Sequence, residues 1–387
     1  MTVLRPETAE EAAAAVREAD EPLRIEGGGG LAGLGRPIQT AATLKLDRLT
    51  GVVEYSPTEL YATFRAGTTL RDAEAALAEN NQRLAFEPPD LTSLYGGQGP
   101  ATVGGLVAAG LSGPARVSAG ALRDYLLGVR FIDGRGEAMH GGGKVMKNVT
   151  GYDLCKLTAG AFGTLGAITE VTFKVLPNPP ETRTLLLNGL SPEAGQAALS
   201  AALKTPFEPL AAAYLPTEHQ AALRFEGFPE SLDYRLKAIT AHLPETDISI
   251  LEGSESASYW RQIRDVSALT AADGEAIWRI STAPTEGPAL AETLKERIGA
   301  RYILDWAGGL VWLAVPEDQE NAGGPAVREA ATKAGGHATL MRGSEAVRAA
   351  VDIFEPLPAP VLELTRGLKR TFDPEGKLNP GRMYAGV

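Results

Sequence analysis

Residues 96–124 constrain the fold of this chain most strongly, because eight of them are glycine and few are charged. Within this stretch, Thr102-Val103-Gly104-Gly105 precedes an apolar run from Leu106 to Leu111. Glycine lets the main chain approach a ligand closely, and successive amide groups in such bends form concave anion sites. A flexible linker would instead be rich in serine or charge. The composition therefore favours a nucleotide cradle over a linker.

A second glycine-rich loop, 27–35, follows a helix that begins at the capping box Thr8-Ala9-Glu10-Glu11 and a short strand at 23–26. We expect a strand at 38–46 after this loop, whereas a helix follows the glycines of a Rossmann fingerprint. No Gly-Lys-Ser/Thr sequence closes the loop, so it is not a Walker loop. Taken alone, the loop is either a tight turn or a phosphate loop.

Length and composition exclude several classes of protein. A chain of 387 residues suggests two or three domains, and its net charge of −11 argues against electrostatic binding of nucleic acid or anionic lipid. The single cysteine, Cys155, excludes an internal disulfide and a four-cysteine iron–sulfur cluster made by this chain alone. The four histidines are far apart, so no metal site is expected. Without a signal segment or an 18-residue apolar run, we expect a cytoplasmic protein that does not span a membrane.

The pattern of strands and helices changes after Pro177 and Pro179-Pro180, which mark a domain boundary. Before this point, a hairpin is predicted around Asp133-Gly134, and a third glycine-rich turn at 163–166 leads into a long apolar strand. After it, the order strand, helix, two strands, helix and strand occurs at 183–251 and again at 276–340. Two βαββαβ units predict an antiparallel sheet with helices on one face. A last helix is predicted at 361–372.

Several segments occur in the order typical of one flavoprotein family. They are 24–29, 100–105, 123–124, 150–154, 163–170, and 373–374 with 379–381. The sequence therefore resembles the vanillyl-alcohol oxidase (PCMH-type) FAD-binding flavoproteins over nearly all of 1–180 and again over 361–384. The resemblance implies an α+β fold. It comprises a two-subdomain FAD-binding module at 1–178, an antiparallel cap domain at 179–355, and a C-terminal helix and tail at 356–387 that return to the FAD module.

Within this family, four segments look closest to the E subunits of bacterial glycolate oxidase: 87–89, 110–114, 145–153 and 335–340. The resemblance implies a complex with a larger FAD-containing subunit and an iron–sulfur subunit. That complex oxidises glycolate, a small 2-hydroxy acid, to glyoxylate. Association with the inner face of a membrane would come only through these partners.

The resemblance also implies that main-chain amides of both glycine bends surround the FAD diphosphate. Covalent attachment would need a histidine just after the first glycines, but position 31 is leucine and Cys155 lies in a predicted helix, so we expect non-covalent FAD. For Ile168, cofactor contact and a place in a core strand remain alternatives. For Arg123 and Asp124, the alternatives are a structural ion pair between the two side chains and a contact of Asp124 with the cofactor. The candidate FAD-binding residues are Gly27, Gly28, Gly29, Gly30, Leu31, Pro88, Ala101, Thr102, Val103, Gly104, Gly105, Ala109, Gly113, Gly120, Asp124, Gly166 and Ile168.

Oxidation of a 2-hydroxy acid needs a base for the hydroxyl proton and a cation for the carboxylate. Related catalytic subunits carry a Glu-His-Gly stretch and a pair of metal-binding histidines, and this sequence has neither. The candidate catalytic residues are therefore His337 and Arg342, with Lys147, Asn148 and Tyr152 on the flavin side. A structural role for His337 beside Gly335-Gly336 is the alternative.

Three functions are compatible with the sequence. The chain is an FAD-binding subunit inside a glycolate oxidase complex, a stand-alone flavin oxidase or dehydrogenase of a small hydroxy acid, or a non-catalytic assembly subunit. Electrons from reduced FAD leave to dioxygen, a quinone or a partner. Because one cysteine cannot build a cluster, we favour a partner.

Overall fold

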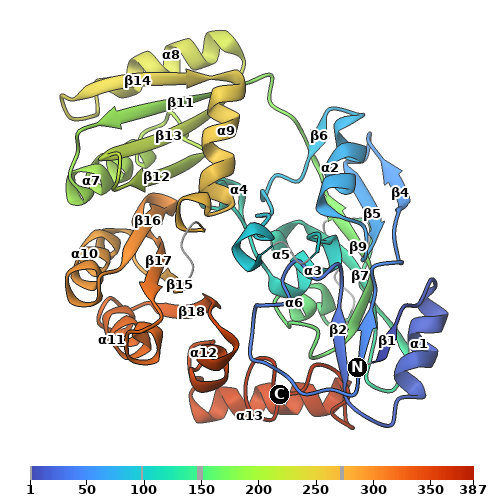
Figure 1. Ribbon diagram of the computed structural model, residues 1–387. Coiled ribbons are helices and arrows are strands. Elements are labelled where there is room, and N and C mark those ends of the chain that lie inside the picture. The colour runs from blue at the N-terminus through green and yellow to red at the C-terminus, as the bar shows by residue number, and fades with distance from the viewer. Residues whose placement is uncertain (1, 97–98, 146–150, 271–273) are drawn as a thin grey trace. The chain divides into compact units, whose positions relative to one another are not determined.

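The computed structural model describes residues 2–96, 99–145, 151–270 and 274–387. The chain forms two compact units (Figure 1). The first comprises Met1–Ser112, Ala121–Asn178 and Pro356–Val387, and the second comprises Gly113–Gly120 and Pro179–Glu355. The short segment Gly113–Gly120 thus groups with the second unit, although it interrupts the first unit in the sequence.

The first unit contains a small parallel sheet and a larger antiparallel sheet. Strands β1 (Thr2–Leu4), β3 (Ala42–Lys45) and β2 (Leu23–Glu26) pair in that order, both pairs parallel. Helix α1 (Ala9–Arg17) begins at Thr8, whose hydroxyl accepts a hydrogen bond from the Glu11 amide at 3.1 Å. Its apolar residues Ala12 and Val16 are fully buried in the same core as Leu23 and Leu44. The Thr8 cap therefore starts a helix that shares a core with the parallel sheet, while Glu11 accepts from the Glu7 amide and does not complete the predicted capping box.

The antiparallel sheet has the strand order β4-β5-β9-β7-β8. Its core holds Phe64, Phe86, Phe131 and Phe173 together with apolar residues of the helices packed against it. The further elements of the first unit are β4 (Val52–Ser56), β5 (Tyr61–Arg65), α2 (Leu70–Ala78), β6 (Gln82–Arg83), η1 (Ser93–Tyr95), α3 (Val103–Ala109), α5 (Leu122–Tyr125), β7 (Leu126–Ile132), β8 (Ala138–Gly142), α6 (Leu154–Thr158), β9 (Ala167–Lys174), β10 (Leu176–Pro177) and α13 (Ala359–Phe372).

The second unit is built on one eight-stranded sheet with the order β14-β11-β13-β12-β16-β17-β15-β18, in which every pair is antiparallel. Each half of the sheet is one βαββαβ unit, as predicted. The first half comprises β11 (Glu181–Asn188), α7 (Pro192–Leu203), β12 (Ala211–Leu215), β13 (Gln220–Gly227), α8 (Pro229–Thr240) and β14 (Asp247–Glu252). The second comprises β15 (Glu275–Ser281), α10 (Gly287–Ile298), β16 (Arg301–Asp305), β17 (Leu310–Pro316), α11 (Gly324–Lys333) and β18 (His337–Arg342).

Shorter segments complete the second unit. They are α4 (Arg116–Ala119), α9 (Gly253–Arg264), η2 (Ser267–Leu269), η3 (Pro284–Glu286), η4 (Trp306–Gly308), η5 (Glu320–Gly323) and α12 (Glu345–Ala350). The two halves of the sheet meet where β12 pairs with β16 at Tyr214 and Leu304. Both residues are fully buried, so the junction is part of the core.

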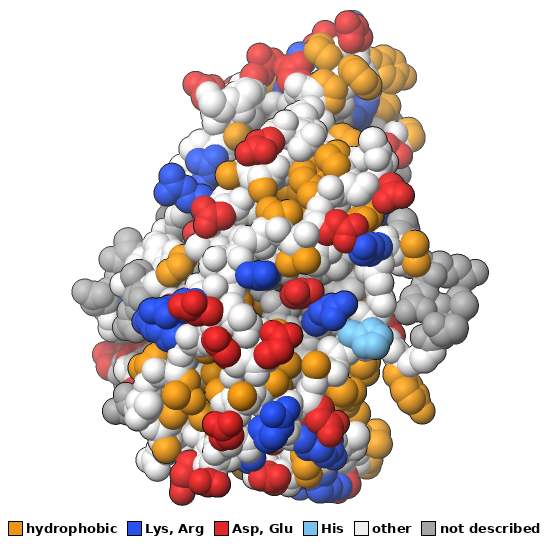
Figure 2. Space-filling view, turned by 90° about the vertical axis from the view of Figure 1, so that its right-hand side faces the viewer, with side chains coloured by type: hydrophobic (Ala, Val, Ile, Leu, Met, Phe, Trp, Pro, Cys, Tyr) orange, Lys and Arg blue, Asp and Glu red, His pale blue; other side chains and the backbone are white. Residues whose placement is uncertain are grey.

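Two features of the described residues bear on membranes and surface charge. None of the helices in the described ranges is both long and apolar enough to traverse a lipid bilayer. On the face in Figure 2, acidic and basic side chains alternate over the coloured surface and do not gather into one broad basic area. Such a mixed face lacks the electrostatic footprint that nucleic-acid binding requires.

Candidate cofactor site

The first glycine bend, Gly27–Gly30, begins directly after strand β2. Gly28, Gly29 and Gly30 are buried. Within the described residues, none of the four amide groups of this bend donates a hydrogen bond to another protein atom. Buried amides are nearly always paired, so a row of unused donors marks a place for an acceptor-rich ligand. Diphosphate oxygens are such acceptors.

The second bend lies against the first. A Cβ atom added to Gly28 would stand 2.3 Å from the Pro100 carbonyl oxygen, and one added to Gly27 would stand 2.4 Å from Thr102 Oγ1. Both distances are too short for any side chain, so only glycine allows the bends to touch. Thr102 caps helix α3 by accepting a hydrogen bond from the Gly105 amide at 3.3 Å. Close packing of the two bends thus brings together residues that are 72 and 75 positions apart in the sequence.

A groove runs along both bends, and a second hollow adjoins it. The two hollows share Ile25, Glu26, Gly27, Gly105 and Ala108 among their lining residues.

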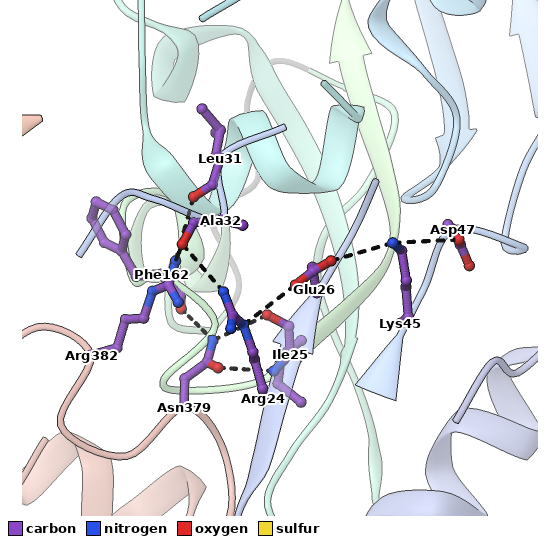
Figure 3. A network of polar contacts seen from close by, with 10 residues as sticks. All are labelled: Arg24, Ile25, Glu26, Leu31, Ala32, Lys45, Asp47, Phe162, Asn379 and Arg382. Carbon is purple, nitrogen blue, oxygen red and sulfur yellow. Dashed lines mark hydrogen bonds and ion pairs between the residues drawn. The ribbon is translucent and has the colours of Figure 1, made fainter. Parts of the chain in front are cut away.

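Residues of the C-terminal tail form hydrogen bonds with the backbone just before and just after the first bend (Figure 3). Asn379 Oδ1 accepts a hydrogen bond from the Ile25 amide at 2.9 Å, and its Nδ2 donates to the Phe162 carbonyl at 2.8 Å. Arg382 Nη2 lies 3.4 Å from the carbonyl oxygens of both Leu31 and Ala32. The tail therefore fixes the entry and the exit of the glycine bend.

A buried ion pair anchors this tail. Lys369 Nζ donates to Asp373 Oδ2 at 2.6 Å and to the carbonyls of Thr164 and Leu378 at 2.8 and 2.6 Å. Asp373 also accepts from the amides of Lys377 and Leu378. Burial lowers the pKa of Lys369, and the Asp373 carboxylate opposes this effect. Because every donor has a partner, the pair holds the tail in one conformation.

Most of the predicted FAD-binding residues line one of the two hollows. Asp124 lines neither, and the expected ion pair between Arg123 and Asp124 is not formed among the described residues. The Asp124 carboxylate instead accepts from the Ala121 amide at 2.9 Å, because consecutive residues of a short helix point in different directions. The larger hollow is lined by Gly27, Gly28, Gly29, Gly30, Leu31, Ala101, Thr102, Gly105 and Ala109, and the smaller by Gly104, Gly166 and Ile168.

Four further candidates are not among the lining residues of either hollow. Val103 is fully buried in the core, and Pro88 is buried without lining either hollow. Gly113 and Gly120 belong to the second unit. The Gly113 carbonyl accepts a hydrogen bond from Trp306 Nε1 at 3.1 Å.

The catalytic candidates in the second unit lie at opposite ends of one strand. His337 and Arg342 are the first and last residues of β18, so five strand steps of about 3.3 Å separate them. Burial and the charge of Arg279 lower the pKa of His337. Tyr152 is 93% exposed, and Lys147 and Asn148 lie outside the described residues. A base and a cation acting on one small substrate must lie closer than His337 and Arg342 do.

The comparisons with known proteins agree with this architecture. Residues 2–142 match the FAD binding domain family FAD_binding_4. The chain is 37% identical to glycolate oxidase subunit GlcE of Escherichia coli K12, over 94% of this chain and 93% of that protein. It is 27% identical to glycolate oxidase subunit GlcD of Bacillus subtilis, over 90% and 80% of the two chains. The crystal structure of p-cresol methylhydroxylase superposes with a TM-score of 0.69 at 17% identity, over 100% of this chain and 88% of that one.

The fold and the sequence matches together define an FAD-dependent oxidoreductase with the PCMH-type architecture. The chain belongs to the family of FAD-linked oxidoreductases that includes glycolate oxidase subunit GlcE. The predicted α+β fold, the two-unit cap sheet and FAD as the cofactor are confirmed.

Proposed function

We propose that this chain is the FAD-binding subunit of a glycolate oxidase complex, which oxidises glycolate to glyoxylate. The similarity to a glycolate oxidase subunit covers nearly the whole of both chains and supports this proposal. The observation that carries it is the contact between two glycine bends at one groove, which the unused buried amides of the first bend border.

The residues of this groove fit FAD. The amides of Gly28, Gly29 and Gly30 would hold the diphosphate, with Thr102 and Gly105 bordering it from the second bend. When bound, FAD supplies a two-electron acceptor for the hydride that leaves the hydroxyl-bearing carbon. Asn379 and Arg382 bind backbone groups on either side of the bend and also line the groove.

We propose that FAD is held without a covalent bond. Leu31, the residue that follows the four glycines, has no nucleophilic atom and lines the groove. Cys155 is buried in the core cluster, and burial raises the pKa of its thiol to about 11. A protonated, enclosed thiol is a poor nucleophile.

We further propose that a partner subunit supplies the iron–sulfur cluster that carries the electrons away. Thiolates from four cysteines hold a typical cluster, and this chain has only one cysteine. In the described residues, no group of three or more His, Cys, Asp or Glu side chains could hold a metal ion. The larger FAD-containing subunit and the iron–sulfur subunit are the proposed partners.

The first test replaces Gly28 in the assembled complex. Gly28→Ala places a Cβ 2.3 Å from the Pro100 carbonyl oxygen and must shift one bend. We expect FAD affinity of this chain to fall about tenfold or more, which corresponds to about 1.4 kcal/mol, and glycolate turnover to fall with it. The control is Gly143→Ala, where an added Cβ meets no atom within 4 Å. Full FAD binding by Gly28→Ala would contradict the site, and full turnover without FAD here would identify an assembly subunit.

The second test separates a subunit from a stand-alone enzyme. The purified chain is mixed anaerobically with glycolate or D-lactate, and the flavin absorbance is followed. We expect bleaching only after the partner subunits are added. Rapid bleaching of the isolated chain would show that it oxidises the hydroxy acid alone.

A further inference from the structure

The eight-stranded sheet of the second unit has two outer strands, and each is the last strand of one βαββαβ half. Strand β18 ends one side of the sheet and β14 ends the other, at the upper edge of the sheet in Figure 1. Because the two halves follow the same chain order, the two outer edges occupy equivalent positions. They can therefore be compared directly.

The chain itself covers the β18 edge. The Leu340 amide donates a hydrogen bond to the Ile353 carbonyl at 2.8 Å, and the Ala338 amide donates to the Glu355 carboxylate at 3.1 Å. Both acceptors belong to the segment that follows helix α12 in the same unit. Two amides on the outer side of β18 thus have partners, so this edge is closed to another strand.

The β14 edge has no such cover in the described part of the chain, where β14 pairs with β11 and forms no backbone hydrogen bond to any other segment. Alternate residues of an outer antiparallel strand point their N–H and C=O groups away from the sheet. The central residues of β14, 248–251, carry no charge, and Ile250 is 47% exposed. An uncovered edge with an uncharged centre is a template for another strand.

Acidic side chains lie at both ends of this edge. Asp247 is the first residue of β14 and Glu252 is the last, and both are exposed. Among the described residues, Asp247 forms no ion pair. Near the other end, the guanidinium of Arg183 is shared by three carboxylates, those of Glu181, Asp233 and Glu252. One cation cannot balance three anions, so both ends of the edge keep a negative charge.

We propose that the β14 edge binds a β-strand of a partner subunit that has a basic residue at each of its ends. An antiparallel strand would continue the sheet through its main chain, and its basic ends would lie opposite Asp247 and Glu252. A second copy of this chain does not fit, because an antiparallel β14–β14 pair in full register places Asp247 opposite Glu252 at both ends. Like charges directly opposite each other destabilise a strand pair.

The identity of the partner as a glycolate oxidase subunit rests on the proposed function, whereas the choice of a basic strand rests on the edge alone. The first arm of the test therefore uses a fluorescent hexapeptide, equal in length to β14, with lysine at both ends and alternating threonine and valine between them. Fluorescence anisotropy measures its binding to the full-length chain. We expect the same peptide with glutamate at both ends to bind about tenfold more weakly or worse.

Variants of the chain test the two carboxylates. Asp247→Asn combined with Glu252→Gln should weaken binding of the lysine peptide by about tenfold. The matched control is Asp318→Asn combined with Glu296→Gln, which removes two exposed carboxylates of the same types elsewhere in the unit and should leave binding unchanged. Equal binding of the two peptides, or equal affinity of the wild type and the β14 variant, would overturn the proposal. Dimerisation of the chain that Ile250→Lys abolishes would also overturn it, because a second copy would then occupy the edge.

The second arm measures hydrogen–deuterium exchange in the chain alone and after assembly with the larger FAD-containing subunit and the iron–sulfur subunit. We expect amides of β14 to exchange about tenfold more slowly or less in the complex, and amides of β18, which are already covered, to stay unchanged. An assembled complex with unprotected β14 would reject this inference and keep the proposed function. Selective binding of the lysine peptide without assembly of the complex would reject the proposed function and keep the edge as a strand-binding surface.

Discussion

Replacing Asn379 by alanine tests whether the C-terminal tail shapes the cofactor groove. Asn379 is 2% exposed and bonds to the Ile25 amide and the Phe162 carbonyl, 354 and 217 residues away in the sequence. Alanine would leave both backbone groups without these partners beside the glycine bend. The residue also has a φ of 43°, a conformation that asparagine tolerates better than alanine.

The magnitude follows from these contacts. Each lost hydrogen bond costs about 1 kcal/mol, and the left-handed backbone costs alanine about 1 kcal/mol more. We therefore expect the first unit of Asn379→Ala to lose about 3 kcal/mol of unfolding free energy. Because Ile25 leads directly into Gly27–Gly30, we also expect the dissociation constant of FAD to rise about tenfold or more.

The assay combines urea unfolding of the FAD-free chain with fluorescence titration of FAD. The matched control is Asn321→Ala, since Asn321 has a similar φ of 49° but lies in the second unit and is exposed. It should cost only about 1 kcal/mol and leave FAD binding unchanged. Equal destabilisation by both substitutions would refute the claim that Asn379 holds the backbone beside the glycine bend. An unchanged FAD affinity in Asn379→Ala would refute it as well.

Two further predictions concern titratable groups. Burial raises the pKa of the Cys155 thiol to about 11. The native chain at pH 8 should therefore react with iodoacetamide far more slowly than the urea-unfolded chain. Similar rates in the two states would contradict the burial of the thiol. Because the folded thiol keeps its proton to higher pH, its contribution to stability should be lost as the pH rises from its ordinary value towards 11. The pKa of His337 is lowered from 6.5, so the unfolded state binds the proton more tightly, and stability should fall as the pH drops from 6.5 through the folded pKa. His337→Gln should reduce this loss, and an NMR titration midpoint above 6.5 would show that the sign is wrong.

The sequence predicted the repeated βαββαβ order because strand and helix periods are local. Local signals also mark helix ends, as Pro288 and Gly299 do for α10. Short strands were harder to predict from the sequence. The strand expected at 38–46 is only Ala42–Lys45, and β1 was missed, because three residues carry too little periodicity. Trp306 follows β16 and turns out of the strand direction, and its amide donates to the Asp305 side chain.

The cofactor site could be predicted from the sequence only in part, because only some of its features are local in the sequence. Glycine clusters are visible in a sequence, so both bends could be proposed as parts of a cradle. The roles of Asn379 and Arg382 beneath the first bend could not be derived, because no local pattern links a residue near the C-terminus to one near position 25.

Composition alone determined that this chain lacks the cysteines for a cluster, and glycine placement determined where its backbone could approach an anion. Only the tertiary structure decided which bends meet and which amides of the described residues are left without partners. The physical reason is the distance along the sequence over which each property acts. Backbone freedom depends on the residue itself, whereas hydrogen-bond satisfaction and desolvation depend on atoms that the fold brings from hundreds of positions away.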